Sequence, residues 1–206
     1  MFPMRPNNSS IPGLLELSAG GGTVAAIYLR NPGAKITLLY SHGNGENLES
    51  IYRQLKQCRR AGYAVLAYDH PGYGRSSGAS SDAGTFNAID SCYRFLVSEG
   101  VNVSPIVLYG RSLGSGPSVD LATREQVGGP VLERGFVSAF RVMTRRRVLS
   151  WDKFENERKL KRIRQPAFVM QAARDEVAGY WQAPCWPQPQ RAQRHFGESK
   201  EPVTMT

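Results

Sequence analysis

Short apolar runs alternate with amphipathic segments along most of the chain. The apolar runs are rich in β-branched and aromatic residues and predict strands over Thr23–Leu29, Lys35–Tyr40, Tyr63–Tyr68, Pro105–Tyr109, Gly129–Leu132 and Ala167–Met170. Apolar residues at helical spacing predict helices over Leu48–Arg60 and Phe86–Val97. Because helices separate the strands, the pattern favours an α/β fold in which a mostly parallel sheet carries helices on both faces.

Polar and glycine-rich turns follow several of these strands, at the end where open α/β sheets bind ligands. The most informative turn is Gly110-Arg111-Ser112-Leu113-Gly114, between a strand and a helix-compatible segment. Gly-x-Ser-x-Gly in that setting is typical of a nucleophile elbow, whose sharp turn leaves no room for side chains at the two glycines and exposes the serine hydroxyl. The N–H of Leu113 would then face a developing oxyanion. An ordinary glycine-rich turn is the alternative.

Two other loops come directly after predicted strands. Ser41–Asn47 is small and flexible, and in a hydrolase such a loop supplies the other half of the oxyanion hole. We expect His42 to hold this loop rather than to act as a catalytic base. Asp69–Gly78 is interpreted as an ordered glycine-rich turn, and it is a poor phosphate cradle because the Walker lysine is missing.

Composition narrows the class of protein. A chain of 206 residues that is 41% hydrophobic suits one globular domain. No apolar run reaches the ~20 residues of a membrane span, and the first residues lack the apolar core of a signal peptide. The three cysteines form no disulfide framework and have no metal-ligand spacing, so we expect a cytoplasmic protein with passive cysteines.

The net charge of +9 is concentrated in residues 141–164, where ten Lys and Arg residues face three Asp and Glu residues. Such a stretch would suit an anionic membrane surface and a membrane-peripheral location, although a solvated helix face is the simpler interpretation. No nucleic-acid-binding motif accompanies it, so we expect no nucleic-acid partner.

Taken in order, several motifs resemble those of the α/β-hydrolase superfamily, and in particular its depalmitoylase-like and serine-aminopeptidase-like hydrolases. They are Ser-His-Gly-Asn-Gly-Glu-Asn, Tyr-Asp-His-Pro-Gly-Tyr-Gly-Arg-Ser-Ser-Gly, Tyr-Gly-Arg-Ser-Leu-Gly-Ser-Gly and Asp175-Glu176-Val177. The resemblance spans residues 22–181 of a single domain over residues 1–206. It implies a serine hydrolase that cleaves an ester, thioester or amide of a small molecule or an acyl-protein, without a metal or organic cofactor.

The resemblance also implies roles for individual residues. Ser112 matches the catalytic nucleophile and Asp175 the acid of the triad, while the oxyanion region corresponds to Gly43, Asn44 and Leu113. Glu133 is a rival for the acid, because some hydrolases place the acid at the end of that earlier strand. We favour Asp175, which follows the predicted strand Ala167–Met170 after a short turn.

The chain departs from the family near its end. Gln171-Ala172 stands where the family usually has His-Gly, and Glu133-Arg134-Gly135 replaces Glu-Ser-Pro. The family's triad histidine sits in a Gly-His-Asn motif downstream of the acid, but here the sole downstream histidine is His195, in another context. The resemblance therefore predicts that the last strand and helix of the fold are missing. A catalytically silent hydrolase-like protein is the alternative function.

The unusual segment after Trp181 has a specific explanation. The codons that encode Glu198–Thr206 can be read in a shifted frame, in which each new codon joins the third base of one codon to the first two bases of the next. With a suitable choice of third bases, this frame encodes Val-Glu-Gly-Ala-Gly-His-Asn-Asp, which contains the missing motif. We therefore hypothesise a single-base deletion just after the Trp181 codon, real or introduced by sequencing. This predicts an aberrant tail over residues 182–206, in which His195 does not reach Ser112 and the chain as written is impaired.

Overall fold

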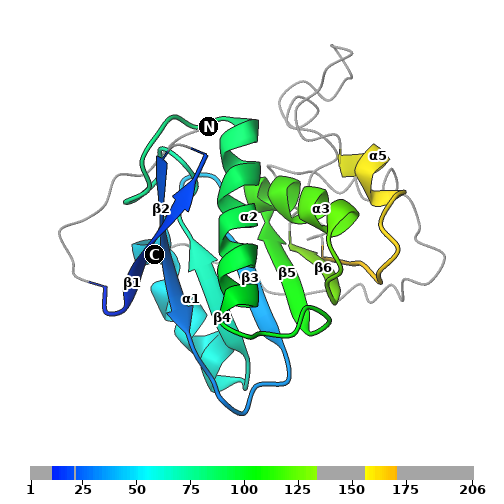
Figure 1. Ribbon diagram of the computed structural model, residues 1–206, viewed down its shortest axis with the longest axis horizontal. Helices are drawn as coiled ribbons and strands as arrows, with labels where there is room; N and C mark the ends of the chain where they lie inside the picture. The colour runs from blue at the N-terminus through cyan, green and yellow to red at the C-terminus, as the bar shows by residue number, and fades with distance from the viewer. Residues whose placement is uncertain (1–10, 21, 134–155, 171–206) are drawn as a thin grey trace, which may run out of the picture.

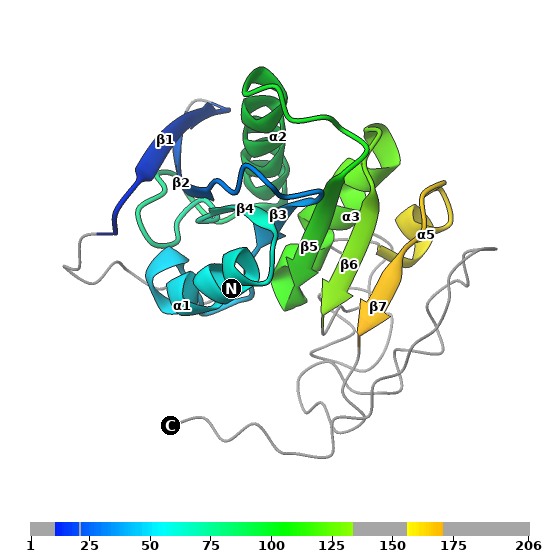
Figure 2. The same cartoon turned by 90° about the horizontal axis from the view of Figure 1, so that it is seen from below.

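The computed structural model describes residues 11–20, 22–133 and 156–170. Within these residues a seven-stranded sheet has the order β1-β2-β4-β3-β5-β6-β7 (Figures 1 and 2). The strands are β1 Leu14–Ala19, β2 Gly22–Leu29, β3 Thr37–Ser41, β4 Ala64–Tyr68, β5 Ile106–Arg111, β6 Gly129–Glu133 and β7 Phe168–Met170. β2 pairs antiparallel with β1 and with β4, and every pair from β4 to β7 is parallel. The predicted mostly parallel sheet is confirmed.

Helices cover both faces of this sheet, as predicted. They are α1 Leu48–Arg60, α2 Asp82–Ser98, the short 3-10 helix η1 Ser112–Gly114, α3 Ser115–Arg124 and α5 Asn156–Leu160. α1 lies on one face and α2 and α3 on the other (Figure 2). α2 begins before the predicted Phe86 because Ser81 caps it, its side chain accepting a hydrogen bond from the N–H of Gly84.

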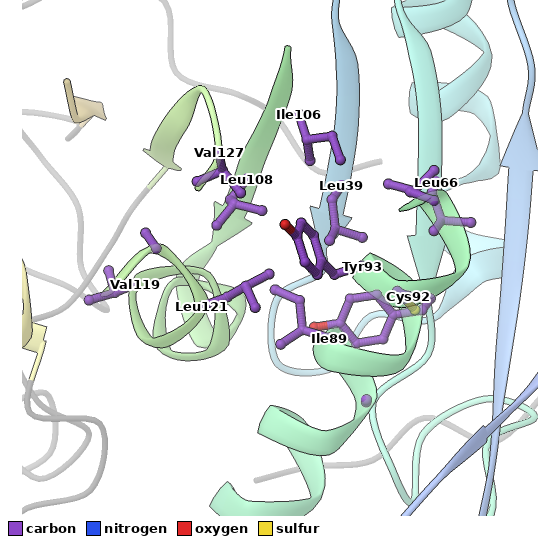
Figure 3. Close-up of a cluster of buried hydrophobic side chains, with 14 of the residues drawn as sticks. Leu39, Leu66, Ile89, Cys92, Tyr93, Ile106, Leu108, Val119, Leu121 and Val127 are labelled. Atoms are coloured by element: carbon purple, nitrogen blue, oxygen red, sulfur yellow. The ribbon is translucent and has the colours of Figure 1, made fainter. Parts of the chain in front are cut away.

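The larger apolar core lies between the sheet and the pair α2 and α3 (Figure 3). Leu39 of β3, Leu66 of β4 and Leu108 of β5 pack there against Ile89 and Cys92 of α2. All five side chains are fully buried. Burial raises the pKa of the Cys92 thiol, which keeps it protonated and agrees with the passive role expected of it.

β1 was not predicted from the sequence. Leu14–Ala19 is an edge strand of half-buried and exposed residues, paired only with β2. Leu15 and Leu17 pack against the larger core, whereas Leu14 packs against the core under α1. The strand is thus stabilised by its pairing with β2 and by these contacts, and its own apolar signal is short. The predicted tail over 182–206, and with it the expected loss of the last strand and helix, lies outside the described residues.

Candidate nucleophile elbow and its supporting loops

Ser112 has a backbone conformation that side chains rarely adopt. It follows β5 directly, and its φ of 48° makes it the only non-glycine residue with a positive φ in the described part of the chain. Left-handed backbone costs an L-residue about 1–2 kcal/mol. Such a cost persists where the surrounding structure fixes the residue, which happens most often at functional sites.

Two glycines make this turn possible. A Cβ on Gly114 would lie 2.0 Å from the carbonyl oxygen of Ser41, at the end of β3. A Cβ on Gly110 would lie 2.6 Å from the carbonyl oxygen of Gly114. The prediction that neither position has room for a side chain is therefore confirmed. The turn places Ser112 at the carboxyl end of β5, between β3 and β6.

The loop after β3 lies against this elbow. A Cβ on Gly43 would come within 3.6 Å of the carbonyl oxygen of Arg111. The N–H of Gly43 donates to Oε2 of Glu46 at 2.7 Å, so this amide already has a partner within its own loop. Asn44 is exposed, and its Oδ1 accepts a hydrogen bond from the hydroxyl of Tyr73 at 2.7 Å. Of the predicted oxyanion residues, Gly43 thus shapes the loop in this structure, while Asn44 lies at its surface.

A charged network connects this loop to the elbow and to β6. The Arg111 guanidinium forms an ion pair with Glu46, and its Nε lies 3.5 Å from Oε1 of Glu133. Burial alone would lower the pKa of Arg111, but the two carboxylates outweigh burial and raise it. Tyr109 donates its hydroxyl proton to Oε2 of Glu133 at 2.7 Å. The rival triad acid Glu133 therefore already serves Arg111 and Tyr109.

His42 holds the loop, as expected. It is fully buried, and its Nδ1 donates to the carbonyl of Gly43 at 2.8 Å. Its Nε2 accepts from the N–H of His70 at 3.3 Å, while Nε2 of His70 donates to the carbonyl of His42 at 3.0 Å. The accepting Nε2 requires a neutral His42 ring, and burial lowers the pKa of His42 well below its usual range and that of His70 to about 4.

Asp69 lies at the centre of the loop after β4. Its Oδ1 accepts from the N–H of Leu48, the first residue of α1, at 2.7 Å, and its Oδ2 from the N–H of Arg75 at 3.0 Å. Burial raises the pKa of this carboxyl to about 6. A Cβ on Gly74 would lie 2.0 Å from Oδ2. The loop therefore encloses a carboxylate of its own, which agrees with the expectation that it is a poor phosphate cradle.

Sequence reasoning missed four residues of this assembly: Glu46, Asp69, Tyr73 and Arg111. Arg111 is the unspecified residue of Gly-x-Ser-x-Gly, and Glu46 lies in the loop after β3, so only their contacts mark them. Asp69 looks in the sequence like an ordinary first residue of a glycine-rich turn, and only its buried N–H partners mark it. Asp175 and His195, by contrast, lie outside the described residues, and so does most of the basic stretch 141–164.

Within residues 156–164, Lys159 forms an ion pair with Asp120 of α3 and lies over the ring of Phe86, 4.4 Å from its centroid. Part of the positive charge of the basic stretch is thus matched locally. Among the described residues, no helix combines the length and the apolar composition needed to span a membrane. No group of His, Cys, Asp or Glu side chains in that part of the chain could hold a metal ion.

The chain is similar to known proteins both in sequence and in structure. A family model described as the alpha/beta hydrolase fold matches residues 36–128. "Alpha/beta hydrolase domain-containing protein 17B" of Xenopus tropicalis is 33% identical over 167 residues, which are 78% of this chain and 57% of that protein. "Alpha/beta hydrolase domain-containing protein aho-3" of Caenorhabditis elegans is 35% identical over 153 residues, 72% of this chain and 46% of that protein. The chain spans about half the length of the curated relatives it matches.

Solved structures support the same architecture. An esterase of Pyrococcus furiosus superposes with a TM-score of 0.75 at 14% identity, covering 90% of this chain and 83% of that one. An alpha-beta serine hydrolase homologue from Coxiella burnetii gives a TM-score of 0.69 at 16% identity, with 87% and 83% covered. At these identities the likeness concerns the fold alone.

Proposed function

The chain belongs to the α/β-hydrolase family, and from this premise we propose that it is a serine hydrolase that cleaves a carboxylic ester, thioester or amide through an acyl-enzyme on Ser112. The observation that carries the proposal is the strained elbow. Ser112 keeps a positive φ between two glycines that tolerate no side chain. A plain glycine-rich turn would put glycine, and not serine, at the strained position.

The proposed reaction has two steps. Ser112 Oγ attacks the acyl carbon while a histidine takes the hydroxyl proton, and the tetrahedral oxyanion collapses as that proton passes to the leaving group. Water then repeats the sequence and releases the acid. We assign the backbone N–H groups of Leu113 and Asn44 to the oxyanion. The N–H of Gly43 donates to Glu46, so it can contribute to the oxyanion hole only if that hydrogen bond breaks. Asp175 orients the histidine.

Labelling with a fluorophosphonate probe tests the nucleophile. If the chain as written is active, we expect the probe to label it, Ser112→Ala to abolish labelling, and Ser98→Ala to retain it, since Ser98 is an exposed residue at the end of α2. Labelling that survives Ser112→Ala would place the nucleophile elsewhere. If the unaltered chain takes no label, the catalytically silent alternative is preferred.

The hypothesis of a lost base gives a second test. Inserting one base after the Trp181 codon should restore the Gly-His-Asn motif and raise turnover of p-nitrophenyl butyrate by orders of magnitude. Triad members act as a unit, and loss of one leaves only a residual ~10³–10⁴ over water. Inserting three bases at the same point adds one residue but leaves the tail unchanged, and should restore nothing. Equal turnover of the original and repaired chains would contradict the hypothesis.

The substrate class follows from the family resemblance and not from the site. The depalmitoylase-like motifs make an acyl-protein or acyl-lipid thioester one candidate and a small ester another. If the basic stretch 141–164 meets an anionic membrane, the chain should sediment with vesicles that contain phosphatidylserine and not with phosphatidylcholine vesicles, and salt should reverse binding. Equal binding to both kinds of vesicle would contradict a membrane-peripheral location that depends on the charge of the basic stretch.

A further inference from the structure

One carboxylate joins the loop after β3 to the nucleophile elbow. Oε2 of Glu46 accepts a hydrogen bond from the N–H of Gly43 at 2.7 Å, and Oε1 of the same side chain accepts one from the guanidinium of Arg111. Gly43 is the second residue after β3, and Arg111 directly precedes Ser112. A single side chain therefore connects two segments that are far apart in the sequence.

The guanidinium is also held from the neighbouring strand. Arg111 is paired in register with Glu133 of β6, and its Nε lies 3.5 Å from Oε1 of that carboxylate. Oε2 of Glu133 accepts a hydrogen bond from the hydroxyl of Tyr109, which lies two residues before Arg111 on the same face of β5. A guanidinium is a rigid planar group with several donors, so it can hold two carboxylates in one arrangement. Arg111 is thus anchored to β6 while it holds Glu46.

The contact between Glu46 and Arg111 begins where the main-chain pairing of the strands ends. In the register of β3 with β5, the last pair is Ser41 and Gly110. One residue further on, a Cβ on Gly43 would come within 3.6 Å of the carbonyl oxygen of Arg111, so the loop still lies against the elbow. Beyond the last pair of residues, the ion pair takes over from the sheet in joining the two segments.

This contact should matter more for reaction rate than for stability. The side chains of Glu46 and Arg111 are about a quarter exposed, and ion pairs of that kind add little to the stability of a fold. Catalysis is more sensitive to geometry, because a displacement of about 1 Å in a reacting group can slow a reaction by about 100-fold.

We propose that Glu46 and Arg111 are positioning residues of the hydrolase site, whose ion pair holds the loop after β3 against the elbow. The pair thereby keeps the two halves of the proposed oxyanion hole, one in that loop and one at Leu113, in a fixed relation to Ser112. The inference rests on the proposed serine-hydrolase function, and it concerns residues that act through the backbone and not by touching the substrate. Glu133 supports them by anchoring Arg111.

The rate constant of fluorophosphonate labelling reports this alignment, because the phosphonyl oxygen needs the oxyanion donors as Ser112 Oγ displaces fluoride. We expect Arg111→Met and Glu46→Gln each to slow labelling by about tenfold. The double variant should be no slower than the slower single variant, since all three lack the same contact. Independent effects, with a double variant about 100-fold slower than the parent, would overturn the inference.

Arg124→Met is the matched control. Arg124 lies between two carboxylates, as Arg111 does, with its guanidinium 2.7 Å from Asp90 and 2.9 Å from Asp120. It is the last residue of α3, at the end of that helix away from the elbow. We expect this variant to leave the labelling rate within about twofold of the parent. A loss of rate equal to that of Arg111→Met would show that labelling follows ion pairing in general, and would overturn the positioning role.

Amide hydrogen exchange tests the loop without using the nucleophile. If the ion pair holds the loop, its loss should make local opening easier, so we expect the Gly43 amide to exchange at least about tenfold faster in Arg111→Met than in Arg124→Met. The amide of Leu39, inside β3, should exchange equally in the two variants, which separates a local effect from a general loss of stability. Equal exchange of Gly43 in both would overturn the inference.

The two proposals fail in different ways. Faster exchange of Gly43 in Arg111→Met together with an unchanged labelling rate contradicts only the positioning role and leaves the hydrolase proposal intact. If the parent takes no label, the same variants are compared in the repaired chain, with one base inserted after the Trp181 codon. If neither chain takes label, the proposed function fails and the positioning role fails with it.

Discussion

The loops after β3 and β4 end neighbouring parallel strands, yet they differ in the burial of their central residues. The loop after β3 carries exposed Asn44 and half-buried Gly45 and Glu46. The loop after β4 is buried at Asp69, His70 and Tyr73, and its hydrogen bonds reach α1 and the first loop. The loop after β3 brings side chains to the surface beside the candidate site, and the loop after β4 holds that loop in place through these hydrogen bonds. The comparison teaches that a glycine-rich turn without a ligand motif can still decide how a site is arranged.

The largest expected effect comes from the same substitution in each loop. Gly74→Ala would place a Cβ 2.0 Å from the buried carboxylate of Asp69 at a φ of 47°, whereas a Cβ on Gly45, at a φ of 76°, meets nothing within 4 Å. We expect Gly74→Ala to cost more than about 3 kcal/mol of unfolding free energy and Gly45→Ala about 1 kcal/mol. Urea denaturation measures both. Equal losses would break the distinction between the two loops.

Acid should destabilise the fold through the histidine pair. A histidine whose pKa is depressed in the folded state contributes stability that is fully present above its pKa in the unfolded state, near 6.5. This stability is lost as the pH falls toward the pKa in the folded state, which is about 4 for His70. Asp69 acts in the opposite direction, because its pKa is raised to about 6 and the folded state takes up a proton first between about pH 6 and 4.

Between pH 7 and 4.5 the Asp69 and His70 contributions are each about 2 kcal/mol and nearly cancel, so the depressed pKa of His42 decides the sign. We expect the unfolding free energy to fall by a few kcal/mol from pH 7 to pH 4.5. Urea titrations at a series of pH values measure it. A free energy that rises on acidification would show that Asp69 outweighs both histidines.

Removing the strain at the elbow should stabilise the protein while it destroys the site. Ser112→Gly relieves about 1–2 kcal/mol of left-handed strain, of which part returns as the extra backbone entropy of glycine. We therefore expect a net gain of about 0.5–1 kcal/mol in unfolding free energy, together with loss of probe labelling. Ser98→Gly, inside the last turn of α2, should lose stability instead. A loss at Ser112 as well would mean that the serine packs more favourably than its φ suggests.

The smallest effect concerns the ion pair between Glu46, in the loop after β3, and Arg111. Glu46→Gln keeps an oxygen for the N–H of Gly43 but loses the charge that faces Arg111. Because both side chains are about a quarter exposed, we expect a cost of about 0.5–1 kcal/mol. Glu49→Gln, which faces Arg75 at 3.3 Å, provides the comparison. A loss of several kcal/mol of unfolding free energy for Glu46→Gln alone would show that the loop after β3 is held as firmly as the loop after β4.

Much of this architecture can be predicted from the sequence. Apolar runs gave the central strands to within one or two residues, because a strand buried on both faces has no polar alternative. The elbow could be located because its two glycines and serine are contiguous, so that local steric limits fix the turn. Edge strand β1 was missed because its half-buried pattern depends on a partner strand.

The roles of the supporting residues were decided by tertiary structure. Glu46 and Arg111 are 65 residues apart, and Asn44 and Tyr73 are 29 apart, so their pairing exists only because β3, β4 and β5 are neighbours in the sheet. Asp69 reads as an ordinary turn residue until α1 brings the N–H of Leu48 to its carboxylate. The sequence by itself determined where the chain must turn sharply and which serine stands at that turn, since those limits act between adjacent residues. Which groups hold that turn depends on contacts between distant residues, and only the folded sheet creates them.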